Sequence, residues 1–397
     1  MKSNRKLRKL ILPSLGFIII VLLLVLGIPL LLRWNTPLAP GLDLPTFTPT
    51  TSGLVSSDRP QEDNVSTTPE TPQMSSTEIN TSSEGEGVQL SKTPAASLTP
   101  SPTVKPFCGG PPVMTVLALG IDTRADNYLY GLADVIRIVR VDFVTPKVTV
   151  LSLPRDLWVE IPGIDNNYGV THGKLNQSYF YGTEGMGYYD GPGGAPGLMA
   201  RTLAQNFNIQ VDHYGSVNMV TFVRMVDAVG GIDIYLPHDV DGRPVDDKTE
   251  DMGYFTAGQQ HFNGDQALRF SRIRKVDTVF DRMDRQTMVL CALRDKLLSP
   301  SVLPKIPQLI ASFQGSVITD LSLSQLSQLA CLAPRISREN LLFTSLPTDL
   351  LEPSRAYDPH LQTNTFIWDT DYDIIRDYLA RFQAGTWPEK PKEPSCP

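Results

Sequence analysis

An uncharged apolar stretch near the N-terminus divides this chain into parts that must fold in different surroundings. Residues 10–32, LILPSLGFIIIVLLLVLGIPLLL, contain no charged side chain and follow the basic segment MKSNRKLRK. At about 1.5 Å per residue, such a stretch can cross a bilayer core of about 30 Å as a helix. We therefore expect one membrane-spanning helix, with residues 1–9 in the cytoplasm because basic segments stay on that side. A cleaved signal peptide is the alternative, but its apolar core is usually shorter and ends in a small-residue cleavage site.

The stretch that follows is predicted to be a spacer. Residues 33–106 are rich in serine, threonine and proline, as in TPQMSSTEINTSSEGEG, and show no sustained apolar periodicity. Such a composition buries too little surface to offset the entropy lost on folding. We expect a disordered, extended tether outside the membrane, with a globular domain beyond it.

The rest of the chain is long enough for one large domain. We expect that domain over residues 107–300, and a C-terminal α/β extension over 301–397 that packs on it and ends in a disordered tail. Short apolar or alternating runs predict strands at 113–120, 134–143, 145–154 and 232–237. Runs with helical spacing predict helices at 196–207, 216–231, 280–299, 321–333 and 369–383. Strands interleaved with helices indicate α/β layers around a mixed sheet.

The cysteines lie in the part of the chain that is expected outside the membrane. All four, Cys108, Cys291, Cys331 and Cys396, follow the apolar run, and no two form a CxxC pair. The spacing argues against a zinc site or a redox dithiol. An even number outside the membrane favours disulfides, for which we expect Cys291–Cys331 and Cys108–Cys396. Buried free thiols are the alternative.

Cationic side chains gather in RFSRIRKVDTVFDRMDRQ, although the whole chain has a formal net charge of -7. Six of them lie in this segment: Arg269, Arg272, Arg274, Lys275, Arg282 and Arg285. Arg272 and Arg274 lie two residues apart and would share one face if SRIR is a strand. Arg282 and Gln286 would share one face of the helix that follows. Paired guanidinium groups suit a multiply charged anion such as pyrophosphate. The alternative is a solvated basic face balanced by the three interleaved aspartates.

Other polar residues follow predicted strands. Asp122 comes after one strand and Asp134 opens the next, so their carboxylates could hold a hard cation such as Mg²⁺ together with phosphate oxygens. Each could instead be a turn or cap residue. Arg155 follows a third strand, and its alternative is a surface pair with Asp156. Because no Ser/His/Asp or Cys/His arrangement is evident, acids and arginines together favour phosphoryl transfer by positioning and charge stabilisation.

The order of these motifs resembles that of the LytR–CpsA–Psr family of bacterial cell-envelope proteins. The motifs lie within about residues 113–299 and read TVLALGIDTR, LADVIRIVRVD, VTVLSLPRDLWVEIPG, HGKLNQSYFYG, DHYGSVNMVTFVRMVDAVGGIDIYLP, FNGDQALRFSRIRK and FDRMDRQ. The resemblance implies a three-layer α/β/α sandwich around a mixed central sheet, with a polyprenyl pyrophosphate bound by its phosphates and its lipid tail in an apolar pocket. It also implies a membrane-anchored, extracytoplasmic phosphotransferase for cell-wall assembly, which moves a glycopolymer from a polyprenyl-pyrophosphate carrier onto peptidoglycan. Nucleic acid is not an expected partner, because the domain would lie across the membrane from DNA.

The resemblance also assigns roles by motif position. The expected ligands of Mg²⁺ (or Mn²⁺) are Asp122 and Asp134, and the expected catalytic arginines are Arg155, Arg272, Arg274 and Arg282. Gln286 matches the glutamine at the start of the family's long helix and is an expected substrate-binding residue.

Two positions depart from the family pattern. The family's arginine two residues before the second acid is Leu132 here, and its acid three residues before Arg282 is Val279. Arg124 could replace that arginine, and Asp281 or Asp277 that acid, as substrate-binding residues. The departures leave open an alternative function, a degenerate protein that binds or cleaves polyprenyl pyrophosphate without transferring a polymer.

Overall fold

The computed structural model describes residues 34–44, 105–247, 249–274, 279–389 and 396. The predicted cytoplasmic tail and membrane span, residues 1–32, lie outside this range, as do residues 45–104 of the predicted tether. Among the described residues, no helix has the length and apolar character that crossing a membrane requires.

The centre of the domain is a mixed six-stranded sheet with the order β11-β6-β1-β2-β3-β12. Its strands are β1 (Val113–Ile121), β2 (Ala133–Asp142), β3 (Lys147–Leu153), β6 (His213–Asn218), β11 (Ile318–Thr319) and β12 (Leu341–Ser345). Antiparallel pairs join β1 to β2 and β2 to β3, whereas β6 pairs parallel with β1 and β12 parallel with β3. The predicted first strand and the predicted hairpin are therefore confirmed.

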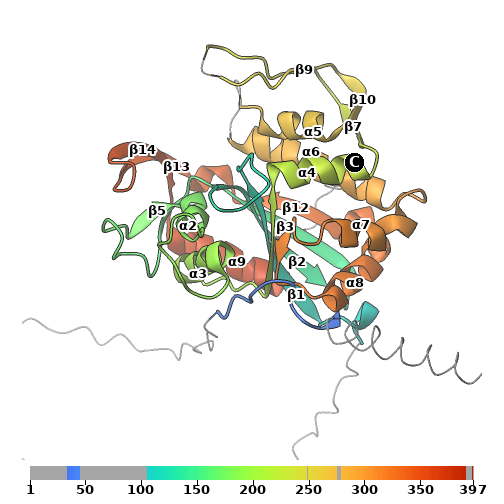
Figure 1. Ribbon diagram of the computed structural model, residues 1–397, viewed down its shortest axis with the longest axis horizontal. Helices are drawn as coiled ribbons and strands as arrows, with labels where there is room; N and C mark the ends of the chain where they lie inside the picture. The colour runs from blue at the N-terminus through green and yellow to red at the C-terminus, as the bar shows by residue number, and fades with distance from the viewer. Residues whose placement is uncertain (1–33, 45–104, 248, 275–278, 390–395, 397) are drawn as a thin grey trace, which may run out of the picture. The chain divides into compact units, whose positions relative to one another are not determined.

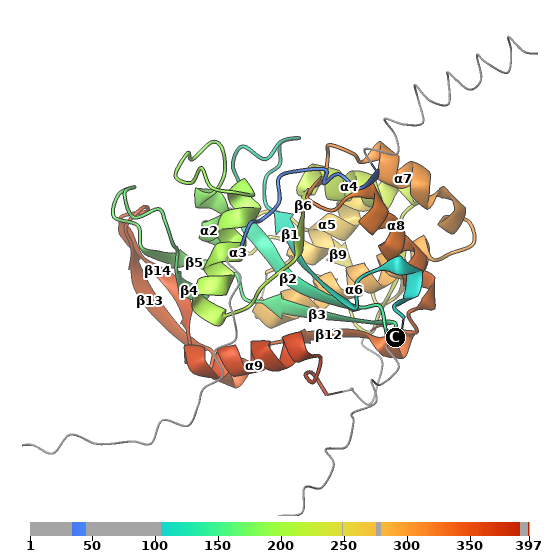
Figure 2. The ribbon, with the colours of Figure 1, turned by 90° about the horizontal axis from the view of Figure 1, so that it is seen from below.

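Helices lie on both sides of the central sheet (Figures 1 and 2), and the side chains of β1 alternate between these two sides. Leu117, Leu119 and Ile121 are buried against α2 (Leu175–Tyr181), α3 (Gly194–Phe207) and α9 (Tyr372–Ala384). This side of the sheet is called the α3 face. Large side chains such as Tyr179, Leu203 and Phe382 fill the space between sheet and helices there.

The opposite side of the sheet, called the α6 face, carries Met114, Ala118 and Gly120. It is covered by α4 (Met219–Ala228), α5 (Gly264–Arg272), α6 (Val279–Leu297), α7 (Ile306–Ser312) and α8 (Leu323–Leu332) (Figure 1). With helices on both faces of a mixed sheet, the domain is the predicted α/β layer structure.

Smaller elements surround these layers. Four two-stranded sheets pair β4 (Trp158–Glu160) with β5 (His172–Lys174), β7 (Ile232–Leu236) with β10 (Gly258–Phe262), β8 (Val240–Asp241) with β9 (Tyr254–Phe255), and β13 (Glu352–Asp358) with β14 (Thr363–Asp369). Short 3-10 helices are η1 (Phe107–Gly109), η2 (Leu303–Lys305), η3 (Ala333–Arg335), η4 (Arg338–Asn340) and η5 (Thr348–Leu350).

Two element predictions are wrong, one at its start and one altogether. The predicted helix 216–231 begins at Met219 instead, because the Asn218 side chain caps it by accepting a hydrogen bond from Thr221 N. SRIR is not a strand: Ser271 and Arg272 end α5, which starts from a capping box between Asn263 and Gln266.

The C-terminal part of the chain belongs to the central sheet. Strand β12 extends the sheet beside β3, and β11 pairs with β6 at the other edge. The predicted boundary at residue 300 is therefore wrong, since residues 301–389 complete the domain instead of packing on a finished one. The predicted tail beyond residue 389 lies outside the described residues, apart from Cys396.

The segment 34–44 packs on the domain. Leu42 is 4% exposed in the core of the α3 face, and Pro37 forms a β-bridge with Ser322. The Tyr214 hydroxyl donates to the carbonyl of Pro40 (3.0 Å), and Arg201 donates to the carbonyl of Asp43 (3.1 Å). The prediction that the tether begins at residue 33 is therefore wrong for this segment.

The four cysteines form two disulfides, but with other partners than predicted. Cys108 bonds to Cys331, and Cys291 bonds to Cys396. The first bond joins η1 to α8, and the second holds Cys396 against α6. The predicted pairing is wrong because the fold brings Cys331 to the start of the domain, a contact across 223 positions that spacing alone does not reveal.

Candidate active site

A cavity of about 880 Å³ lies between the α6 face of the sheet and the helices α4, α5 and α6. Its apolar side chains include Val217, Met219, Phe222, Met225, Val245, Met252, Leu268, Val289, Leu290 and Leu293. The sheet contributes small residues to this wall, among them Ala118 and its β6 partner Gly215. A Cβ placed on Gly215 would meet no atom within 4 Å, so the space above this pair of strands is open.

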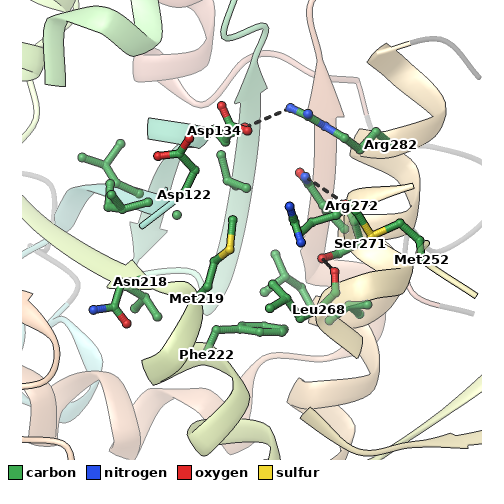
Figure 3. Close-up of a pocket in the computed structure, with 18 of the residues that line it drawn as sticks. Asp122, Asp134, Asn218, Met219, Phe222, Met252, Leu268, Ser271, Arg272 and Arg282 are labelled. Atoms are coloured by element: carbon green, nitrogen blue, oxygen red, sulfur yellow. Dashed lines mark hydrogen bonds between the residues drawn. The ribbon is translucent and has the colours of Figure 1, made fainter. Parts of the chain in front are cut away.

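Two predicted metal ligands lie at one end of the cavity (Figure 3). Asp122 follows β1 and Asp134 opens β2, and the antiparallel turn between these strands brings them to the same edge of the sheet. Leu132 fixes both residues through its main chain. Its N–H donates to Asp122 Oδ1 (2.6 Å), and its carbonyl accepts from the N–H groups of Asp122 and Asp134 (both 3.0 Å).

Three predicted catalytic arginines surround Asp134 and form what is called the arginine cluster. Arg155 Nη1 lies 2.5 Å from Asp134 Oδ1, and Arg274 Nη2 lies 3.2 Å from Oδ2. Arg282 Nη2 donates to the carbonyl of Asp134 (3.1 Å). Asn176 Nδ2 adds a weaker contact to Oδ1 at 3.4 Å. These arginines come from three separate segments, so the fold gathers positive charge that the sequence distributes over more than a hundred residues.

The local charges shift the pKa values of these groups. Burial raises the pKa of the Asp134 carboxyl, but the charges of Arg155 and Arg282 outweigh it and hold the pKa below its usual value. Burial raises the pKa of Asp122, and the charge of Asp134 adds to the rise. Burial also lowers the pKa of the Arg282 guanidinium to about 10, and the neighbouring charge of Arg155 acts in the same direction. The arginine cluster thus holds more positive charge than Asp134 alone can balance, which favours an added anion.

A second group of charges lies beside the cluster at the mouth of the cavity. Arg124 Nη2 and Arg272 Nη2 both contact Glu250 Oε2, at 2.6 Å and 3.0 Å. Gln286 also lines the cavity, and its Nε2 lies 3.5 Å from the carbonyl of Ser271. Of the predicted site residues, Asp122, Asp134, Arg124, Arg272, Arg274, Arg282 and Gln286 line the cavity, and Arg155 contacts one of them.

Asp281 is the predicted site residue that the structure does not bring to the cavity. It lies exposed in the first turn of α6 and is absent from the cavity lining. Arg285 donates to the carbonyl of Ile273 (2.7 Å) and so holds the end of α5 against α6. Arg269 pairs with Asp265 one turn earlier on α5. Lys275 and Asp277 lie outside the described residues, and so does the side chain of Val279.

Three polar residues at the site were not predicted from the sequence. Glu250 comes from an acidic stretch without periodicity, where nothing distinguishes it from neighbouring acids. Asn176 follows a short strand and reaches Asp134 only through the tertiary fold. Arg137 is 3% exposed and donates to Thr287 and to the carbonyl of Met283, so it joins β2 to α6. An arginine within the alternating run of β2 was a usable signal, because it replaces an apolar residue on a covered face.

The donor set at Asp122 and Asp134 can be compared with what a cation needs. Within the described residues, no three His, Cys, Asp or Glu side chains form a metal-binding group. Two carboxylates alone suit Mg²⁺, which usually keeps several waters and takes its other ligands from phosphate oxygens. The Asp122 side chain accepts its one hydrogen bond at Oδ1, so among the described contacts Oδ2 has no donor. Burial raises the pKa of Asp122 and repulsion from Asp134 adds to the rise, and a cation would relieve that repulsion.

Comparison with known proteins identifies the family. The family model described as the LytR_cpsA_psr family matches residues 79–371. The chain belongs to this family. The matched range includes β12, which agrees with a domain that continues past residue 300.

Two curated relatives and one solved structure are similar to this chain. The polyisoprenyl-teichoic acid–peptidoglycan teichoic acid transferase TagU of Oceanobacillus iheyensis is 32% identical over 219 residues, which cover 54% of this chain and 61% of the relative. TagV of Bacillus subtilis, with the same description, is 30% identical over 213 residues, covering 53% and 50%. The crystal structure of B. subtilis TagV matches with a TM-score of 0.51 and 25% identity, covering 68% of this chain and 97% of that one. The chain thus matches between half and two thirds of the length of these curated relatives.

Proposed function

We propose that this protein is a membrane-anchored, extracytoplasmic phosphotransferase that moves a glycopolymer from a polyprenyl-pyrophosphate carrier onto peptidoglycan. The observation that carries the proposal is a single cavity with both an apolar wall and a charged mouth. An apolar wall suited to a lipid chain leads to a mouth with arginines and two acids suited to phosphates. The relatives TagU and TagV, named as transferases of polyisoprenyl-linked teichoic acid to peptidoglycan, support the same reaction.

In the proposed reaction the prenyl chain lies along the apolar wall, and the pyrophosphate lies at the arginine cluster. A hydroxyl oxygen of peptidoglycan attacks the phosphorus next to the glycopolymer, and its proton passes to solvent water. The bond from that phosphorus to the bridging oxygen breaks, and polyprenyl phosphate leaves with the electron pair. Arg155, Arg272, Arg274 and Arg282 stabilise the charge that develops on the phosphate oxygens.

Asp122 and Asp134 would hold Mg²⁺ (or Mn²⁺), which supplies charge neutralisation and alignment of the phosphates when bound. Asp134 has a second role that needs no cation. Its carboxylate and carbonyl orient Arg155, Arg274 and Arg282, so it keeps three guanidinium groups directed at one place. The apolar run at residues 10–32 would hold the domain at the membrane that contains the lipid carrier.

The test is a transfer assay with the full-length protein in detergent, a labelled polyprenyl-pyrophosphate-linked saccharide, peptidoglycan and Mg²⁺. Replacing Arg272 and Arg274 together by alanine should lower the rate of transfer about a hundredfold or more, because two donors to the phosphates are lost. Arg269→Ala is the matched control, since this arginine lies on the same helix and pairs with Asp265 away from the cavity. Unchanged transfer in the double variant would disprove the assigned site.

A second candidate function is cleavage or binding of the pyrophosphate without polymer transfer, which the leucine at position 132 favours. The structure gives Leu132 a main-chain role in placing Asp122 and Asp134, and leaves the mouth without the arginine that the family pattern expects there. The same assay separates the two functions. Label that enters peptidoglycan indicates transfer, whereas label released as free saccharide phosphate indicates cleavage.

A further inference from the structure

Glu250 forms ion pairs with Arg124 and Arg272, the two arginines at the mouth of the cavity that do not belong to the arginine cluster. A single carboxylate oxygen, Oε2, lies 2.6 Å from Arg124 Nη2 and 3.0 Å from Arg272 Nη2. From this geometry we propose that Glu250 is a built-in competitor for the substrate pyrophosphate, and that the pyrophosphate must displace it to reach these arginines. The inference rests on the proposed function and adds a residue that limits which anions the site accepts.

The charge of the mouth explains why a carboxylate lies there. Five guanidinium groups converge on the site, from Arg124, Arg155, Arg272, Arg274 and Arg282, and among the described residues the acids that form ion pairs with them are Asp134, Asp156 and Glu250. Among the described residues, Glu250 is the acid that forms an ion pair with Arg272, so removing it would leave Arg272 beside its cationic neighbours without that counter-charge. Glu250 therefore balances the mouth when no phosphate is present, and a bound pyrophosphate would make that charge redundant.

Displacement of Glu250 is physically easy. Its side chain is 45% exposed, and those of Arg124 and Arg272 are 68% and 25% exposed, so water reaches both ion pairs and weakens them, that of Arg124 most. A pyrophosphate offers several oxygens to each guanidinium in bidentate geometry, which a single carboxylate oxygen does not match. A strongly anionic ligand would win this competition, whereas a weakly charged one would not.

The alternative role for Glu250 is purely structural. The residues around it, Gly242, Val245 and Met252, line the cavity, so its ion pairs could serve only to hold this segment at the mouth. The two roles predict opposite effects of removing the charge. Loss of a structural contact weakens ligand binding, whereas loss of a competitor strengthens it.

Calorimetric binding of farnesyl pyrophosphate to the full-length protein in detergent with Mg²⁺ separates these roles. Glu250→Gln should bind about threefold to tenfold more tightly than the unmodified protein, the range expected when weak surface ion pairs no longer compete. Asp247→Asn is the matched control, because it removes one charge from the same exposed stretch and is not part of the cavity lining. Glu250→Asp, which keeps the charge, should return the affinity toward that of the unmodified protein.

Each outcome of this experiment decides the proposal. Tighter binding by Glu250→Gln alone supports it, and so does binding that Glu250→Gln gains where the unmodified protein shows none. Equal or weaker binding by Glu250→Gln, or an equal gain in Asp247→Asn, overturns it and leaves the phosphotransferase intact. Absence of binding in every form overturns both, since no anion site would then exist for Glu250 to block.

Discussion

The two faces of the central sheet use the same strands for opposite purposes. On the α3 face, β1 presents Leu117, Leu119 and Ile121, which are buried against helices. On the α6 face the same strand presents Ala118 and Gly120, which line a cavity of about 880 Å³. Because side chains alternate along a strand, small residues at every second position hollow one face without weakening the other.

The faces also differ in how their helices are held. Both disulfides involve helices of the α6 face: Cys108–Cys331 holds α8, and Cys291–Cys396 holds α6. The α3 face relies on packing, since the four cysteines of the chain are all used in these two bonds. A wall that borders an open cavity gives up part of its packing energy, and cross-links that restrict the unfolded chain can offset that loss.

Truncating one leucine on each face should give the largest effect and tests this contrast directly. Leu117→Ala should lower the free energy of unfolding by about 2–5 kcal/mol, because it leaves a void in a filled core. Leu268→Ala on the cavity wall should cost clearly less, because that side chain already borders open space. Urea unfolding of both variants measures the difference, and equal losses would mean that the cavity is closed in solution.

Replacing Asp134 and replacing Asp122 should change the free energy of unfolding in opposite directions. Asp134→Asn should lower the free energy of unfolding at neutral pH by about 1–3 kcal/mol, since the arginines around it lose their counter-charge. Asp122→Asn should raise it, because a buried carboxylate whose pKa is raised is costly when charged and the amide keeps an oxygen for Leu132 N–H.

The pH dependence of these two effects follows from the directions of the pKa shifts. The lowered pKa of Asp134 gives a stabilisation that is present above the unfolded pKa of about 3.9 and is lost as the pH falls through the folded value. The raised pKa of Asp122 gives a stabilisation that is present below the unfolded pKa of about 3.9. That stabilisation is lost as the pH rises through the pKa of Asp122 in the folded protein. Unfolding curves from pH 3 to 8 should therefore show both substitution effects shrinking toward acid. The same sign for both at pH 7 would contradict the assigned charges.

Much of this fold could be predicted from local sequence patterns. The first strand and the hairpin that follows it were predicted because alternation is a property of neighbouring residues, and Asp122, Asp134 and Arg155 were selected as candidates because they lie at the ends of predicted strands. SRIR alternates like a strand, but its first two residues end a capped helix, so there the local pattern misled.

Contacts between distant residues were not predictable in this way. The pairing of β12 with β3 and the disulfide across 223 positions depend on which elements the fold brings together. Glu250 was missed for the same reason, since it becomes distinct from its acidic neighbours only where it meets Arg124 and Arg272.

The smallest expected change in stability comes from refilling the cavity at Gly215. This residue has room for a side chain, because a Cβ built there meets no atom within 4 Å and its backbone lies outside the left-handed region. Gly215→Leu should therefore leave the free energy of unfolding within about 0.5 kcal/mol of the unmodified protein, or raise it, as expected when a strand glycine gains a side chain over open space. The α6 face would then resemble the α3 face at this point.

The same substitution should separate the lipid chain from the phosphates in binding. Gly215→Leu should weaken farnesyl pyrophosphate about tenfold or more while leaving inorganic pyrophosphate unchanged, because the added side chain fills the apolar wall and does not reach the arginine cluster. Gly215→Ala is the control, since one methyl group occupies little of a cavity of about 880 Å³. Equal binding of farnesyl pyrophosphate by Gly215→Leu would mean that the prenyl chain lies elsewhere. The hollow in the α6 face would then need a different explanation from the lipid it is proposed to hold.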